Sequence, residues 1–184
     1  MKRLFIGLDF GENVTEPIQR AIRKMKTTFD QREIAAKWSQ LQDLHITLVF
    51  IGERPDEDVD KIKGDVEKLV THHKAFDLKL SGMGAFPDAQ SARVLWLGVQ
   101  KRQELLDLQS ELEGALLSTS GEDYIPHVTV AKIRNLKSVR NIISPFLRQR
   151  WGQFHVGHVV LFESIQQGPY TSYKPLAKFK LQSV

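Results

Sequence analysis

The chain has 184 residues and no cysteine, with 41% apolar and 26% charged residues. This composition fits one globular domain and excludes a disordered chain, a thiol nucleophile, a cysteine zinc site and a disulfide scaffold. The formal net charge of +4 favours an anionic partner only weakly, because many basic proteins bind no nucleic acid.

The first residues are not expected to act as a leader peptide. Lys2 and Arg3 precede an apolar run, but Asp9 interrupts it and no small-residue cleavage site follows. No later apolar stretch is long enough to cross a bilayer. We therefore expect a cytoplasmic monomer that makes no membrane contact.

Hydrophobic periodicity predicts alternating strands and helices along the chain. In chain order, the expected elements are a strand at 2–10, a helix over 18–29, strands at 35–38 and 44–51, a helix over 59–69, strands at 76–80 and 94–99, a helix from 105 to 116 closing near Gly121, a strand at 127–133, a short helix over 139–146, and strands at 156–162 and 173–181. The first helix is expected to begin near Thr15 and Pro17, because a hydroxyl caps free N–H groups and proline is tolerated in the first turn. This order predicts an α+β domain with mixed or antiparallel sheets and outer helices.

One short motif occurs twice, roughly half the chain length apart. His45-Ile46-Thr47-Leu48 and His127-Val128-Thr129-Val130 share the order histidine, apolar, threonine, apolar. Both copies lie in apolar, β-branched surroundings, which predicts a strand for each. Because side chains alternate across a strand, the histidine and threonine of each copy share one face. If the two strands are neighbours, two His–Thr pairs face one cleft.

Such a cleft suits phosphate chemistry. A neutral imidazole can take a proton from water while a charged one donates a proton to a leaving oxygen. Threonine hydroxyls can hydrogen-bond the non-bridging phosphate oxygens, where negative charge gathers in the transition state. Either motif alone would fit an ordinary strand histidine paired with the backbone, and the repeat is what favours catalysis.

The repeated motif resembles that of the two-histidine (2H) phosphoesterase superfamily, in particular the RNA 2′,3′-cyclic phosphodiesterases also called 2′-5′ RNA ligases. Similar segments lie along most of the chain, at 3–9, 44–52, 86–87, 93–98, 126–130 and 168–170. The resemblance implies a bilobal α+β fold, with two pseudo-symmetric lobes that each have a mostly antiparallel sheet and outer helices. The lobes would intertwine as one domain over residues 1–184, with the active site in the cleft between them.

The resemblance also implies roles for individual residues. His45 and His127 would be catalytic, with His127 as the base that activates water and His45 as the acid that protonates the departing 3′ oxygen. Thr47 and Thr129 would bind the phosphate. The product would carry a 2′-phosphate, and reversal of the reaction would give 2′-5′ ligation.

One position departs from the relatives, which often carry arginine five residues after the second histidine. Here that residue is Lys132, a candidate phosphate ligand, and Arg134 follows as a candidate RNA contact. Strict alternation would place both side chains on the face opposite His127 and Thr129 unless a bulge intervenes.

Three aromatic residues are candidates to stack a nucleobase at the cleft. Tyr170 follows a Gly-Pro turn, and Phe50 and Trp38 lie near the first motif. For each of them, packing in the core is the commoner fate.

No metal site or other cofactor is predicted. The chain has no His-Glu-x-x-His sequence, and three-residue spacing on one strand would point His155 and His158 to opposite faces. Two histidines that share the proton transfers also require no metal.

The expected activity is hydrolysis of RNA 2′,3′-cyclic phosphate ends, and the expected partner is RNA or a nucleotide with such an end. Two alternatives stay open. The same cleft could hydrolyse another cyclic phosphate, such as an ADP-ribose cyclic phosphate. A binding module could instead hold a nucleotide or RNA without turnover.

Overall fold

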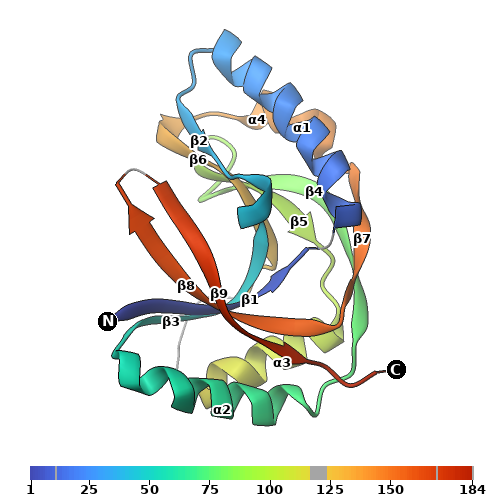
Figure 1. The fold of residues 1–184 in the computed structure, drawn as a ribbon. Coiled ribbons are helices and arrows are strands. Elements are labelled where there is room, and N and C mark those ends of the chain that lie inside the picture. The colour runs from blue at the N-terminus through green and yellow to red at the C-terminus, as the bar shows by residue number, and fades with distance from the viewer. Residues whose placement is uncertain (11, 117–123, 169, 184) are drawn as a thin grey trace.

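The computed structural model describes residues 1–10, 12–116, 124–168 and 170–183, without the side chains of residues 12–15 and 170. The strands in this part of the chain are β1 (Lys2–Asp9), β2 (Ala36–Trp38), β3 (His45–Arg54), β4 (Phe76–Phe86), β5 (Ala92–Val99), β6 (His127–Lys137), β7 (Arg150–Val156), β8 (His158–Gln167) and β9 (Tyr170–Lys180). They form one curled sheet in the order β7-β4-β5-β6-β3-β1-β8-β9, and β2 pairs with β6 (Figure 1). Every pairing between these strands is antiparallel, which confirms the α+β class.

The helices cover this sheet in two groups. They are α1 (Glu12–Gln31), α2 (Val59–Val70), α3 (Gln103–Ala115) and the short α4 (Arg140–Ile143). α1 packs against β7, whereas α3 packs on α2 and β3, and α2 also contacts β9. Figure 1 shows α1 and α4 at one end of the molecule and α2 and α3 at the other. We call β3-β1-β8-β9 the first half-sheet and β2 with β6-β5-β4-β7 the second.

The core follows the predicted apolar periodicity. In α1 the stripe of Ile18, Ile22, Met25 and Phe29 is buried, so the spacing identified the face that packs on the sheet. No helix within the described residues is long and apolar enough to cross a membrane.

The predicted start of the first helix is wrong. α1 begins at Glu12, so Thr15 is a helical residue rather than a cap, and Pro17 lies inside the helix. The apolar spacing located the helix but not its start. The predicted end of the third helix at Gly121 lies outside the described residues, and α3 itself ends at Ala115.

Several strand bounds differ from the prediction by a few residues, since β3, β6 and β8 continue to Arg54, Lys137 and Gln167 and β9 begins at Tyr170. Two differences are larger. β4 continues to Phe86, because a bulge with Gly82 at φ +74° interrupts the alternation without ending the strand. β7 was not predicted: among the described strands it pairs with β4 alone, and its mixed sequence shows no clear alternation, as is common for edge strands.

The two half-sheets join where the repeated motifs meet. β3 and β6 pair antiparallel, and the register places Ile46 opposite Val128. These two residues occupy equivalent positions, directly after His45 and His127. An antiparallel pair that aligns equivalent residues relates the two motifs by a local two-fold axis.

Candidate active site

The two motif histidines are held in the same way. The Nδ1 atom of His45 lies 2.7 Å from the carbonyl oxygen of Asp43, and Nδ1 of His127 lies 2.8 Å from that of Ile125. A carbonyl oxygen can only accept, so Nδ1 carries the proton and donates it in both rings. The remaining nitrogen, Nε2, is then the acceptor in each neutral imidazole, which is the state a general base needs.

Burial lowers the pKa of both imidazoles below the usual histidine value. For His45, the nearby positive charges of His127 and Lys132 lower the pKa further, and the hydrogen bond to the carbonyl of Asp43 opposes these effects. Both rings are therefore neutral in the free protein at neutral pH. The pairing of Ile46 with Val128 places the two motifs side by side.

Aromatic rings account for this burial. The ring centroid of His45 lies 4.9 Å from that of Phe5 and 4.5 Å from that of Tyr173. On the other side of the junction, His127 meets Phe86 edge-on with centroids 5.0 Å apart. These rings exclude water from the imidazole faces, and the charged form of each histidine loses solvation as a result.

A β-bulge in β6 directs Lys132 to the catalytic face. The register pairs Leu95 with Ala131 and Trp96 with Thr129, so Val130 is an extra residue. Val130 and Ala131 are both buried, and after them Lys132 is exposed. The strict alternation expected from the sequence fails here. Because of the bulge, the side chain of Lys132, five residues after His127, lies on the same face of β6 as His127 and Thr129.

β3 contains the matching bulge. Its pairing with β1 skips Leu48, and Leu48 and Val49 are both buried. The residue five positions after His45 is Phe50, whose side chain is 67% exposed. Phe50 is therefore not a core residue, and the local two-fold axis makes it the counterpart of Lys132.

The structure brings several predicted residues to one cavity of about 540 Å³. Its lining includes His45, Thr129 and Lys132, together with Tyr173 and Gln167 from the β8–β9 hairpin. A cavity of this size is adequate for a nucleotide. His127 and Thr47, as the structure describes them, lie outside this lining.

The remaining candidates occupy other places. Arg134 is exposed on β6 and lines neighbouring cavities rather than the one at His45. Trp38 lines the His45 cavity, and its ring meets Phe29 edge-on with centroids 5.1 Å apart. The side chain of Tyr170 is outside the described part of the structure.

Two residues that sequence reasoning missed fix the threonines. The Ser39 hydroxyl donates to the carbonyl oxygen of Thr129, and the Tyr124 hydroxyl donates to the carbonyl oxygen of Thr47, each at 3.0 Å. Both donors lie just before the motif of the opposite half-sheet. No spacing within a strand could have indicated these contacts, because they depend on how the halves meet.

His155 and His158 lie on different strands, so the expectation that they share one strand and point to its opposite faces is wrong. His155 lies in β7 and hydrogen-bonds Asp77 at 2.9 Å, whereas His158 begins β8 and hydrogen-bonds Asp9 at 2.6 Å. Within the described ranges, no group of three or more histidine, aspartate or glutamate side chains is arranged to hold a metal ion.

Acidification from pH 7 to pH 5 should destabilise the protein partly through His45. Its folded pKa lies below the unfolded value of about 6.5, so below that pH the unfolded chain binds more protons and the free energy of unfolding falls. In His45→Asn, we expect the loss of unfolding free energy between the two pH values, measured with urea, to be smaller than in the wild type. An equal loss in both proteins would show that His45 does not contribute.

Similarity to known proteins identifies the family of this chain. Residues 14–168 match the model of the 2′-5′ RNA ligase superfamily. The chain belongs to this superfamily. An RNA 2′,3′-cyclic phosphodiesterase of Methanothermobacter thermautotrophicus is 25% identical, over 97% of this chain and 98% of the relative. A protein of the same name from Thermotoga maritima is 30% identical, over 72% of this chain and 70% of the relative.

Two solved structures share the fold of this chain. E. coli LigT in its apo form has a TM-score of 0.78 and 25% identity, and the match covers 98% of this chain and 97% of LigT. The Thermus thermophilus protein TT0787 has a TM-score of 0.77 and 23% identity, and the match covers 98% of both chains. The family expected from the resemblance is thereby shown, and so is an α+β fold with a curled antiparallel sheet.

Proposed function

We propose that this chain hydrolyses 2′,3′-cyclic phosphate ends of RNA to 2′-phosphates. The observation that carries the proposal is the pair of motif histidines, each fixed through Nδ1 to a backbone carbonyl and related by the junction of the half-sheets. The named relatives with similar chain length are RNA 2′,3′-cyclic phosphodiesterases, and E. coli LigT has been crystallised with 3′-AMP and with phosphate.

In the proposed mechanism, the two histidines act in opposite senses. Neutral His127 takes a proton from water through Nε2 while the water oxygen attacks phosphorus. The bond between phosphorus and the 3′ oxygen breaks, and protonated His45 gives its proton to that oxygen. The phosphate then remains on the 2′ oxygen, and the two histidines have exchanged protonation states.

The lowered pKa of His45 suits its proposed role as the general acid. A proton that is held weakly is readily transferred to an alkoxide leaving group. The anionic substrate offsets the desolvation of the imidazolium when it binds, so it favours the protonated form that the reaction needs. We propose that the hydroxyls of Thr47 and Thr129 and the ammonium of Lys132 bind the non-bridging oxygens, where charge develops.

We propose that residues 1–184 form one domain of two intertwined, pseudo-symmetric lobes with the active-site cleft between them. The two half-sheets, their narrow junction and the packing of α1 on β7 support it. We further propose that the enzyme works without a metal, because the two imidazoles supply both proton transfers. We also propose that it is a cytoplasmic monomer.

The test is product analysis with 2′,3′-cyclic AMP in the presence of a metal chelator. We expect 2′-AMP as the product, resolved from 3′-AMP by chromatography. Formation of 3′-AMP would overturn the assignment of the leaving group. If neither this nucleotide nor a short RNA with a cyclic end reacts, an ADP-ribose cyclic phosphate is the next substrate, and nucleotide binding without any product would favour a binding module.

A further inference from the structure

We propose that a basic track beside β2 binds the phosphates of the RNA that precede the cyclic end, so that the enzyme prefers an RNA chain to a mononucleotide. The track consists of Arg23, Lys26, Lys37, Lys132 and Arg134 from α1, β2 and β6. This inference rests on the proposed function, because it starts from a cyclic end bound at His45.

Cavities connect the catalytic residues to α1. The cavity of about 540 Å³ at His45 shares Lys37 and Trp38 with one of about 640 Å³ between α1 and β2, and with a third of about 500 Å³. Arg134 lines the second and third cavities. Since all three cavities are lined by Lys37 and Trp38 of β2, an RNA strand that leaves the His45 cavity can follow β2 toward α1.

The lining of this path is positively charged. Arg23, Lys26, Lys37 and Arg134 line the 640 Å³ cavity, and none of the described residues in that lining is an aspartate or a glutamate. Among the described residues, Arg23, Lys26 and Arg134 have no carboxylate within ion-pair distance, unlike Lys63 of α2, which pairs with Asp60 at 2.9 Å. The third cavity includes one acid, Asp30, and the His45 cavity includes another, Asp43.

The pairing of β2 with β6 adds a second indication of an anionic ligand. The register places Lys37 directly opposite Lys132. Like charges at directly opposite positions of an antiparallel pair destabilise it. Asp43 lies close enough to Lys37 for their charges to interact, which offsets part of the repulsion. A phosphate bound between the two ammonium groups would be attracted by both of them.

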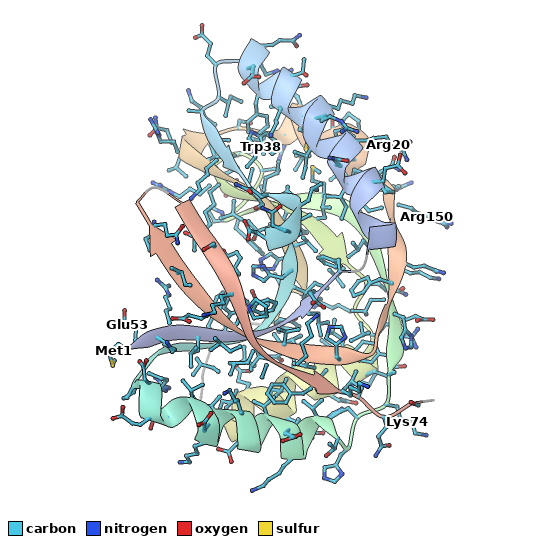
Figure 2. All side chains as sticks on the ribbon, viewed as in Figure 1. Met1, Arg20, Trp38, Glu53, Lys74 and Arg150 are labelled. Carbon is cyan, nitrogen blue, oxygen red and sulfur yellow. The ribbon has the colours of Figure 1, made fainter. Side chains whose placement is uncertain are left out.

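Trp38 supplies an aromatic surface along the same path. Its half-buried ring lines all three cavities, and the Nζ atom of Lys26 lies 6.0 Å from the ring centroid. Figure 2 shows Trp38 below α1 and beside β2. A positively charged groove with an aromatic platform is the usual combination for binding a single nucleic acid strand, because it contacts the phosphates and one base or ribose.

The first test measures binding, so that it does not depend on catalysis. A labelled RNA hexanucleotide with a 3′-phosphate is titrated with wild-type protein and with Arg23→Gln/Lys26→Gln. We expect the variant to bind about tenfold more weakly. The slope of log affinity against log salt should fall by about 1.4, which corresponds to two lost contacts at about 0.7 each.

Lys68→Gln/Lys74→Gln is the matched control, because it removes the same charge elsewhere. Lys68 lies on α2, and Figure 2 places Lys74 at the opposite end of the molecule from Trp38. We expect this control to bind within twofold of the wild type. Equal weakening in both variants would show that only net charge matters and would overturn the track. The track would also be overturned if the wild-type protein bound the hexanucleotide no more tightly than it binds 3′-AMP.

Turnover separates this inference from the proposed function. In Arg23→Gln/Lys26→Gln, we expect kcat/KM to fall about tenfold on an RNA with a cyclic end and less than twofold on 2′,3′-cyclic AMP, because neither side chain lines the His45 cavity. Equal losses on both substrates would overturn the track. A wild-type protein that binds RNA through the track but hydrolyses neither substrate would overturn the proposed function alone.

Discussion

Replacing His127 with alanine should lower kcat on 2′,3′-cyclic AMP about 10³-fold. The variant loses the base that takes the proton from water, and general acid–base catalysis contributes about 10²- to 10⁴-fold. The side chain is partly exposed and hydrogen-bonds only the carbonyl of Ile125 among the described residues, so the fold should survive its removal. Single-turnover rates and thermal unfolding measure the two effects. His45→Ala should show a loss of similar size, because the leaving oxygen then departs without a proton.

His155→Ala is the matched control for these variants. It also removes a histidine that hydrogen-bonds one neighbour, but His155 is exposed on β7 and pairs with Asp77, outside the His45 cavity. Its rate should equal that of the wild type within twofold. A near-normal rate in His127→Ala would exclude the two-histidine mechanism.

Replacing Thr129 with valine should lower kcat about 10²-fold, which corresponds to about 2.7 kcal/mol of transition-state stabilisation. Valine keeps the shape and strand preference of threonine and removes only the hydroxyl. The Ser39 hydroxyl donates to the backbone carbonyl of Thr129, so that contact does not depend on the Thr129 side chain. The loss should therefore appear in kcat more than in stability.

Thr129→Ser tests whether the hydroxyl is the group that matters. Serine restores the donor while removing a methyl group, and we expect it to recover most of the rate on 2′,3′-cyclic AMP. If the serine variant is as slow as the valine variant, Thr129 acts through packing and does not donate to the phosphate.

The sequence predicted most of what depends on local pattern. The stripe of α1 and the strands of both motifs follow from periods of 3.6 and 2, which one segment of chain displays by itself. The edge strand β7 has no such pattern, because only its pairing with β4 makes it a strand. The pairing of the two motifs through Ile46 and Val128 could be expected from the repeat, but its register could not.

The bulges are the main reason why the site could be predicted only in part. An extra residue at Val130 leaves no clear trace in composition, since Val130 and Ala131 both suit a buried strand. Its effect is nevertheless to reverse the face on which Lys132 lies. The aromatic rings of Phe5, Phe86 and Tyr173 around the histidines likewise come from distant strands, and only the assembled sheet brings them together.

Elements from the two ends of the chain pack against each other, and this determines when the protein can fold during its synthesis. α1 packs on β7, and β1 lies between β3 and β8, so both N-terminal elements need strands that begin only at Arg150 and His158. Contacts this distant in sequence form slowly and cannot form before the later strands are made. One edge of β1 and the face of α1 that packs on β7 therefore lack their partners through most of synthesis, and native folding is completed only after nearly the whole chain has been translated.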